Sequence, residues 1–401
     1  MSLQPSGKYS RGAASTAVHA GERLATGKEI PSSSPIHIAT AYAYETAADL
    51  DAVFSDNSLG YVYSRYGNPT VRGLEIAIAA LEGTEEAVAY ASGMAAIFGA
   101  ITETTHPGQS IVISRDVYGA TFSLVQDYLS TNGIIAHFVD ILDLETVAQV
   151  VDSVQPAAIL AETASNPLIR VADIPALAAI ARGAGAKLVI DNTFVSPVLV
   201  QPASLGADLV VHSATKFLGG HGDATGGVVA TSSRHAAGLR QNQKLTGAIL
   251  SPFDAWLTHR GIKTLPLRMK QHCANARDVV AWLQNDTRID TVYYPGVSCA
   301  LPDGQFRTGD HGSMLSFEIH NAGQAAVFRF LDALQLVTPA PTLGDVYSLT
   351  LYPAMSSHRA LTPEQRAGIG IGDNLVRLSV GIEDVADIID DLDQALAAAV
   401  G

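Results

Sequence analysis

The sequence predicts an α/β protein with a large, mainly parallel sheet domain and a smaller C-terminal α+β domain. From about residue 71, short apolar runs alternate with amphipathic helical patterns. This alternation is typical of βαβ units whose sheet is covered by helices on both faces. The chain has 401 residues, 47% of them hydrophobic, which is enough for a substantial core in two or three domains, or in one large domain with appendages.

The N-terminal part, residues 1–60, is polar and lacks a periodic pattern, so we expect an extended arm or a disordered segment. Residues 61–255 are expected to form the main domain. Its helical patterns cover residues 71–81, 121–129, 144–151 and 174–181, and a further helix opens near Gly93. Its strand candidates are residues 87–91, 111–114, 134–139, 158–161, 188–190, 209–211 and 228–230.

Residues 256–401 are expected to form the smaller domain. A long connecting helix is predicted from residue 252 to about 281, with an interruption near Gly261 and Pro266. The strands predicted beyond it cover residues 315–319 and 376–380. A terminal helix is predicted from about residue 384 to 399.

Charge and composition narrow the class of protein. The net charge of −14 argues against nucleic acid or an anionic membrane as a partner. The first thirty residues contain no apolar signal-peptide core, and no uncharged apolar stretch approaches the length of a membrane span. Cys273 and Cys299 form no disulfide framework and no CxxC pattern, which fits a reducing compartment. We therefore expect a cytoplasmic protein.

Lys216 is the most informative single residue. It follows the apolar run 208–212, and Ser213 and Thr215 precede it within three residues, while a glycine-rich loop follows. A lysine at the end of a buried strand is a candidate for a lowered pKa and a nucleophilic amine that forms a Schiff base with an aldehyde. The alternative is a solvated lysine in a loop after an edge strand.

Two other strand ends carry suitable groups. Ser92, Gly93 and Met94 follow the run 87–91 and open a helix, whose backbone N–H groups can receive a phosphate. Asp191 ends the run 186–190 and could keep a pyridine nitrogen protonated, cap a helix or bind a metal. A lysine, a carboxylate and a phosphate cup at three strand ends are what pyridoxal phosphate needs.

Competing ligands have less support. The metal interpretation would need further ligands, for which His212, His221 and Asp223 are candidates, but no HxH or HxxxH spacing is present. We therefore expect no metal. The nucleotide motif GxxxxGK[ST] is missing, and the glycines at 183 and 185 end a helix instead of opening one.

Several motifs together resemble the γ-family of pyridoxal-phosphate enzymes. This family comprises cystathionine γ-synthase, cystathionine γ-lyase, methionine γ-lyase and O-acylhomoserine sulfhydrylase. The resemblance runs from about residue 15 to the C-terminus in the order of the family. Its motifs are YVYSRYGNPT at 61–70, SGM at 92–94, DVYG at 116–119, ETASNP at 162–167, DNTF at 191–194, SATK at 213–216 and LVRLSVG at 375–381.

The resemblance implies fold type I of the pyridoxal-phosphate enzymes, the aspartate-aminotransferase-like fold, and a role for each matching residue. Lys216 would form the Schiff base with the cofactor, and Asp191 would pair with its pyridine nitrogen. The other cofactor-binding residues would be Ser92, Gly93, Met94, Ser213 and Thr215 at the phosphate, Tyr118 stacked on the ring and Asn166 near the ring oxygen. Arg377 would bind the substrate carboxylate, with Tyr63 and Thr342 as further substrate contacts. In the family, Tyr63 and Arg65 reach the cofactor of a neighbouring subunit. We therefore expect a homodimer with a shared active site, within a tetramer.

The resemblance also implies the reaction. Lys216 would remove the α-proton of an amino acid, and Tyr118 would assist as acid and base. We expect γ-elimination on a sulfur amino acid (methionine, cystathionine or homocysteine), giving 2-oxobutyrate, ammonia and a thiol. The alternative is γ-replacement on an O-acylhomoserine.

Two further points concern function. Ala120, Gln243 and Pro341 depart from the relatives, and we expect positions of this kind to choose the substrate. A binding protein that had lost its chemistry would be expected to lack Lys216 or Asp191, and both are present.

Overall fold

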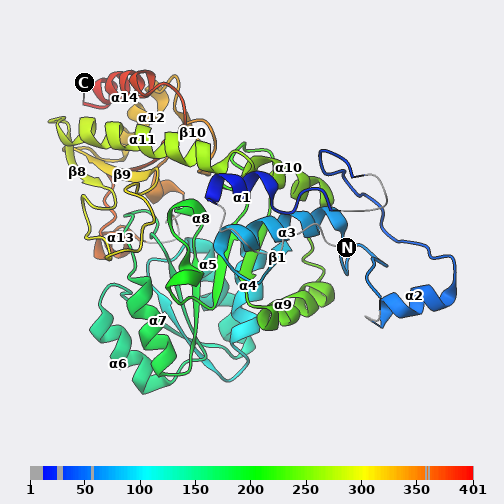
Figure 1. Ribbon diagram of the computed structural model, residues 1–401. Coiled ribbons are helices and arrows are strands. Elements are labelled where there is room, and N and C mark those ends of the chain that lie inside the picture. Colours follow the sequence, from blue (N-terminus) through cyan, green and yellow to red (C-terminus); the bar gives the residue numbers. More distant parts are fainter. Residues whose placement is uncertain (1–11, 25–29, 56–57, 357–358, 360–361, 401) are drawn as a thin grey trace.

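The computed structural model describes residues 12–24, 30–55, 58–356, 359 and 362–400. The larger domain is built on a seven-stranded sheet in the order β1-β7-β6-β5-β4-β2-β3 (Figure 1). Strands β2 to β6 are parallel to one another, whereas β7 is antiparallel to both of its neighbours. The strands are β1 (Glu86–Tyr90), β2 (Ser110–Ser114), β3 (Ile135–Val139), β4 (Ala158–Glu162), β5 (Lys187–Asp191), β6 (Leu209–Ser213) and β7 (Gly227–Thr231).

Helices cover both faces of this sheet because its strands are apolar on both faces. In β6, for example, Val210 packs into the core on one face, while Leu209 and Val211 pack into the core on the other. The first face is covered mainly by α1 (Ala13–His19), α3 (Pro69–Glu82), α6 (Leu144–Val154), α7 (Ile174–Gly183) and α8 (Ser196–Leu199). The second face is covered by α4 (Gly93–Thr104), α5 (Gly119–Ser123), the π-helical η1 (Leu124–Leu129) and α9 (Ser233–Thr246). The short helices η2 (Ser130–Asn132) and η3 (Pro202–Leu205) complete this domain.

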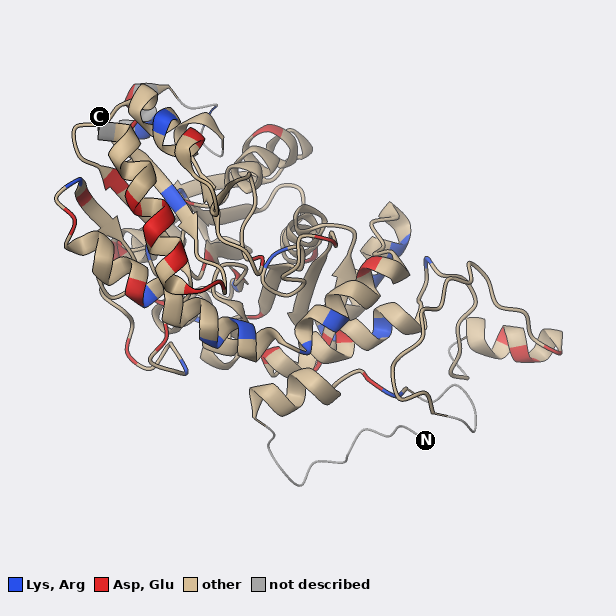
Figure 2. Cartoon of the chain, turned by 90° about the horizontal axis from the view of Figure 1, so that it is seen from above, with Lys and Arg blue, Asp and Glu red and all other residues tan. Residues whose placement is uncertain are grey.

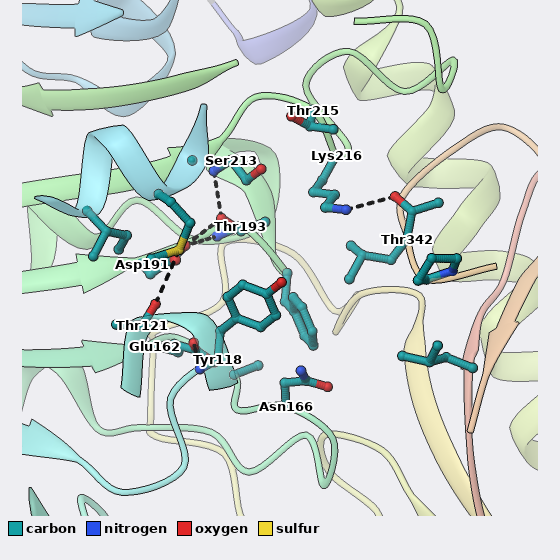
Figure 3. A pocket seen from close by; sticks show the side chains of 18 of the residues that line it. Tyr118, Thr121, Glu162, Asn166, Asp191, Thr193, Ser213, Thr215, Lys216 and Thr342 are labelled. Atoms are coloured by element: carbon teal, nitrogen blue, oxygen red, sulfur yellow. Dashed lines mark hydrogen bonds between the residues drawn. The ribbon is translucent and has the colours of Figure 1, made fainter. Parts of the chain in front are cut away.

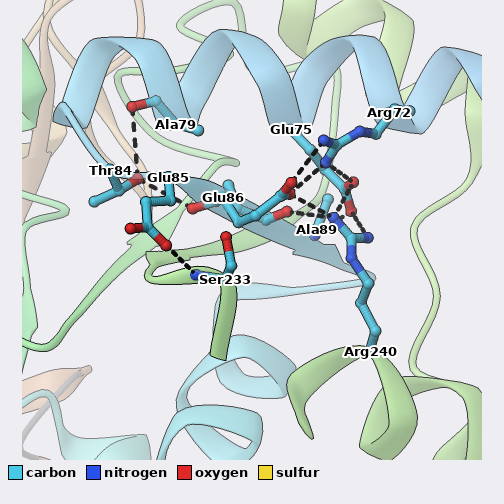
Figure 4. Close-up of polar contacts among 10 residues, drawn as sticks. Arg72, Glu75, Ala79, Thr84, Glu85, Glu86, Ala89, Ser233 and Arg240 are labelled. Atoms are coloured by element: carbon cyan, nitrogen blue, oxygen red, sulfur yellow. Dashed lines mark hydrogen bonds and ion pairs between the residues drawn. The ribbon is translucent and has the colours of Figure 1, made fainter. Parts of the chain in front are cut away.

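Side chains from α3 and α9 form hydrogen bonds with backbone N–H and carbonyl groups at the free edge of β1 (Figure 4). The N–H of Ala89 donates to Glu75 Oε1 at 3.1 Å, and the carbonyl of Ala87 accepts from Arg240 Nη2 at 2.9 Å. The carbonyl of Ala89 accepts from the side-chain amide of Gln243. An unpaired edge strand can pair with another chain, so these contacts protect the sheet at this end.

The C-terminal domain has a five-stranded sheet in the order β10-β11-β12-β9-β8 and a core of its own. Its strands are β8 (Ile289–Tyr293), β9 (Met314–Ile319), β10 (Thr338–Pro339), β11 (Leu349–Leu351) and β12 (Leu375–Ser379). Its helices are α11 (Leu265–Gln284), α12 (Gln324–Ala333), η4 (Pro353–Met355), α13 (Pro363–Gly368) and α14 (Val385–Val400). Two residues, Lys263 and Thr264, separate α11 from the preceding α10 (Pro252–Ile262), so the expected interruption of the connecting helix is confirmed.

Several predicted elements need correction. The N-terminal arm contains two helices, α1 and α2 (Ala47–Phe54), so the irregular conformation predicted for these segments is wrong. Thr46 caps α2 by accepting the N–H of Asp49. Residues 1–11, 25–29 and 56–57 of the arm lie outside the described residues. The helix predicted at 121–129 is divided between α5 and η1.

Charged residues of both signs are interspersed along the helices of both domains (Figure 2). Among the helices that the structure describes, none is both long and apolar enough to span a membrane.

Candidate active site

A cavity of about 470 Å³ lies beyond the carboxyl ends of β4, β5 and β6 (Figure 3). This is the position at which open parallel sheets bind ligands. Segments of the C-terminal domain complete its wall, among them Pro341, Leu351 and Arg377. All of the predicted site residues line this cavity except Tyr63 and Arg65.

Lys216 lies in the turn after β6, an internal strand between β5 and β7, so the alternative of a loop after an edge strand is wrong. Its Nζ donates a hydrogen bond of 2.7 Å to Thr342 Oγ1. Burial, and after it the positive charge of Arg377, lowers the pKa of Lys216 to about 8. A neutral, nucleophilic amine is therefore far more accessible here than in an ordinary surface lysine.

The end of the cavity near α4 has the groups that a phosphate needs. Ser92 caps α4, and the first N–H groups of the helix have no carbonyl partner within it. A Cβ atom on Gly93 would lie 2.8 Å from Ser213 Cβ and 2.9 Å from Ser213 Oγ. Glycine therefore permits the helix terminus to approach the Ser213 hydroxyl, and Thr215 lines the same cavity. Open N–H groups, a helix dipole and hydroxyls fit a phosphate dianion.

Asp191 lies at the end of β5. Its Oδ1 accepts from the backbone N–H of Thr193 at 2.9 Å and also from the Thr193 hydroxyl. Burial raises the pKa of Asp191, although the two Thr193 donors oppose the shift. A carboxylate at this position suits the protonated nitrogen of a pyridine ring.

Glu162 is a cavity residue that the sequence analysis did not assign to the site. It ends β4 beside Asp191, and its Oε1 accepts the backbone N–H of Tyr118 at 2.6 Å. Burial, and after it the charge of Asp191, raises the pKa of Glu162 well above its usual range. The signal that could have found it is the one that found Asp191, a carboxylate directly after an apolar strand.

Arg377 lies on β12, the central strand of the smaller sheet, so its side chain is no edge-strand charge. Its Nη1 donates to Asn166 Oδ1 at 2.9 Å, and its Nη2 donates to the carbonyl of Thr342 at 3.2 Å. Burial lowers the pKa of Arg377 to about 10. No carboxylate pairs with this guanidinium among the described residues, and such a group is suited to hold a substrate carboxylate.

Phe194 is a second cavity residue without a predicted role. Its ring lies 5.9 Å from the guanidinium carbon of Arg377, so it supports the arginine from the wall of the cavity. The sequence contains it within the DNTF motif but gives it no role of its own, because an apolar side chain in a loop carries no chemical signal.

Tyr63 and Arg65 lie away from the cavity of their own chain. Arg65 Nη1 donates to the carbonyl of Lys244 at 2.6 Å, and its guanidinium carbon lies 4.9 Å from the ring centre of Tyr66. The Tyr63 side chain is 40% exposed. Their expected contact with the cofactor of a neighbouring subunit stays a prediction.

The residues considered for a metal do not come together. His212 is buried against Glu82, whereas His221 and Asp223 are exposed. Among the residues that the structure describes, no three or more His, Cys, Asp and Glu side chains form a group suited to a metal ion.

The fold, together with the lysine, the carboxylate and the phosphate cradle, defines a pyridoxal-phosphate enzyme. The chain belongs to the family of Cys/Met metabolism PLP-dependent enzymes, which matches residues 14–397. The cofactor is therefore pyridoxal phosphate, and the resemblance noted in the sequence is confirmed.

Characterised relatives and solved structures agree on the family. The chain is 41% identical to an L-methionine γ-lyase of Pseudomonas putida, over 91% of this chain and 92% of the relative. It is 40% identical to an O-succinylhomoserine sulfhydrylase of Pseudomonas aeruginosa, over 95% of this chain and 94% of the relative. A crystal structure of cystathionine γ-synthase from Xanthomonas oryzae pv. oryzae superposes with a TM-score of 0.90 at 35% identity, covering 98% of this chain and 99% of the other. These relatives differ in reaction, so the family alone does not choose among them.

Proposed function

We propose that this enzyme catalyses γ-elimination on a sulfur amino acid, and that methionine and homocysteine are better substrates than cystathionine. One amino acid and one water give 2-oxobutyrate, ammonium and the thiol that carried the γ-sulfur. The bond between Cγ and sulfur breaks, and the sulfur leaves with a proton.

The composition of the cavity wall carries this proposal. Among the described residues, its ionisable side chains are Tyr118, Glu162, Asp191, Lys216 and Arg377. Tyr118, Asp191, Lys216 and Arg377 each have an expected role toward the cofactor or the reacting end of the amino acid, and Glu162 accepts the backbone N–H of Tyr118. Most of the accessible surface of the wall is apolar, with Ile97, Leu343, Leu351 and Pro341 among its residues. Pro341 stands where the family resemblance leads us to expect a glutamate in enzymes that act on cystathionine. A small, uncharged thioether or thiol suits this wall better than a substituent with a second amino and carboxyl group.

The side chains divide the work as follows. Bound pyridoxal phosphate supplies the electron sink that makes the protons next to the amino-bearing carbon removable. Arg377 holds the substrate carboxylate, which fixes the Cα–H bond relative to Lys216. Lys216 Nζ, with a pKa lowered to about 8, takes the proton from Cα and moves a proton at Cβ. Tyr118 Oη delivers a proton to the departing sulfur.

The second candidate function is γ-replacement on an O-acylhomoserine. The 40% identity to an O-succinylhomoserine sulfhydrylase over nearly the whole chain favours it. The same side chains would serve, but an external thiol would add to the substrate instead of water completing the elimination.

We also propose a dimer in which Tyr63 and Arg65 enter the partner's active site. The segment around them has exposed apolar side chains, including Ile38 at 82% and Leu59 at 101% exposure. Such side chains are typical of surfaces that another chain covers. We further propose that two such dimers form a tetramer. We also propose a cytoplasmic location, which is in keeping with the free thiols of Cys273 and Cys299.

A substrate panel tests the reaction. The enzyme is incubated with methionine, homocysteine, cystathionine and O-acetylhomoserine, each with and without sulfide, and both 2-oxobutyrate and homocysteine are measured. We expect 2-oxobutyrate from methionine and homocysteine without any added thiol, and kcat/KM for cystathionine at least about tenfold lower. Product formed only from O-acetylhomoserine with sulfide would overturn the proposal in favour of replacement. The Lys216→Ala variant serves as the inactive control.

A further inference from the structure

Glu162 and Asp191 are neighbouring carboxyl groups at the floor of the active site. They end β4 and β5, which are parallel, and they are direct partners in the register of these strands. Paired positions in adjacent strands point to the same face, and the strands lie about 4.8 Å apart. Glu162 is 9% exposed, so water contributes little to its solvation. Two carboxyl groups therefore lie side by side, Glu162 largely removed from water and Asp191 partly exposed to the cavity.

No cation neutralises this pair. Among the described residues, neither Glu162 nor Asp191 has an ion pair within 4 Å. The neighbouring Arg170 is already engaged, because its Nη1 contacts Asp116 at 2.5 Å and its Nη2 contacts Asp140 at 2.8 Å. Two adjacent carboxyl groups in such surroundings cannot both ionise, so one of them keeps its proton.

Hydrogen bonds decide which carboxyl group ionises. Asp191 accepts two donors, both from Thr193, and the positive potential of His212 across the sheet also lowers the pKa of Asp191. Among the residues that the structure describes, Glu162 accepts only from the N–H of Tyr118. Donors stabilise a carboxylate, so the negative charge lies on Asp191 and the proton on Glu162.

Glu162 also positions Tyr118 (Figure 3). Tyr118 is the N-cap residue of α5, and its side chain, which lines the cavity, is 46% exposed. Its loop is fastened by the contact of Asp116 with Arg170 and by the 2.6 Å hydrogen bond from the Tyr118 N–H to Glu162 Oε1. A protonated carboxyl group retains a carbonyl oxygen that accepts this bond.

We propose that Glu162 is a positioning residue that stays protonated in the working enzyme. As a neutral acid it leaves a single negative charge, on Asp191, for the pyridine nitrogen of the cofactor, and it holds the Tyr118 loop against the cavity. This inference does not depend on which amino acid the enzyme cleaves.

A pair of isosteric variants separates the two carboxyl groups. Glu162→Gln keeps a neutral carbonyl acceptor, and we expect its dissociation constant for pyridoxal phosphate to stay within about twofold of the wild type. Asp191→Asn removes the charge, and we expect affinity to fall at least about tenfold. Weak binding by Glu162→Gln would overturn the neutral-acid role. Unchanged binding by Asp191→Asn would instead overturn the pairing of Asp191 with the pyridine nitrogen. Neither result bears on the proposed reaction, which the substrate panel tests separately.

A second comparison excludes a merely structural effect. Glu162→Asp keeps the ionisable group but is too short to reach the Tyr118 N–H, so we expect it to bind the cofactor more weakly than Glu162→Gln. The infrared spectrum of the wild-type holoenzyme at pH 7 should also contain the carbonyl stretch of a protonated carboxyl group, and this band should disappear in Glu162→Gln. Absence of that band, or better binding by Glu162→Asp than by Glu162→Gln, would overturn the proposal.

Discussion

Lys216 Nζ donates a 2.7 Å hydrogen bond to Thr342 Oγ1 and thereby joins the two domains across the active site. The lysine follows a strand of the large sheet, and Thr342 lies between two strands of the small one. The carbonyl of the same Thr342 accepts from Arg377. One residue of the C-terminal domain therefore contacts both the amine and the guanidinium on which the proposed reaction depends.

Lys216 should react with pyridoxal phosphate at lower pH than an ordinary lysine. Because its pKa is lowered to about 8, the fraction of Lys216 in the neutral form increases as pH rises toward 8 and approaches one well above this pH. For the cofactor-free protein we expect the rate of cofactor incorporation to rise about tenfold per pH unit below pH 8 and then to level. Stopped-flow absorbance measures this rate. A rate that still rises beyond pH 10 would contradict a desolvated amine.

Thr342→Val should shift this profile. The hydroxyl oxygen of Thr342 accepts from the Lys216 amine and favours its charged form, whereas the similarly shaped valine offers no acceptor. A bond of this kind contributes about 1.5 kcal/mol, so the midpoint should move about one pH unit lower. The same substitution at the exposed Thr131, Thr131→Val, is the matched control and should leave the midpoint unchanged. An unchanged midpoint would mean that the bond is absent in solution.

Complementation tests the shared site. Lys216→Ala and Arg65→Ala subunits should each be inactive or weak when alone. If Arg65 binds the partner's cofactor, each active site takes Lys216 from one subunit and Arg65 from the other. A mixed dimer then has both substitutions in one active site, and its second active site is intact. Co-expression with two affinity tags and assay of the purified mixed species measures the recovery. No recovery, with mixed dimers present, would place Arg65 in its own chain's structure, where it bonds to the carbonyl of Lys244.

Gln243→Ala should reduce stability without changing substrate choice. The sequence comparison suggested that Gln243 takes part in selecting the substrate, but its amide bonds to the carbonyl of Ala89 at the edge of the large sheet. Loss of a partner for a buried carbonyl costs about 1–3 kcal/mol in the free energy of unfolding. Urea denaturation measures the loss, with Leu245→Ala, at a side chain 74% exposed, as the control. An altered ratio of substrates at unchanged stability would restore the original interpretation.

The parts of the site that the sequence predicted share a local signal. Ser92 and Asp191 stand directly after an apolar run and Lys216 stands four residues after one, and parallel strands bring such positions to one edge of a sheet. Arg377 had no such signal, because an arginine in a strand is compatible with a solvated edge. Only the resemblance to the family assigned it a role.

The contacts missed by the sequence analysis join distant segments. The bond between Lys216 and Thr342 spans 126 positions, and nothing in the local pattern of either residue announces it. Helix α9 was missed because only Ala236, Leu239 and Gln243 of its 14 residues are buried, which leaves too narrow an apolar stripe. The two helices of the N-terminal arm were missed because their segments are short and weakly apolar.

The most direct test of the whole account is to locate the cofactor. The holoenzyme is treated with borohydride, which converts a Schiff base into a stable amine, and the digested protein is analysed by mass spectrometry. We expect loss of the yellow colour and the pyridoxyl phosphate mass on the peptide that contains Lys216, with none in the Lys216→Ala variant. The same label on another lysine, such as Lys187 or Lys263, or no label at all, would contradict the assignment of the active site.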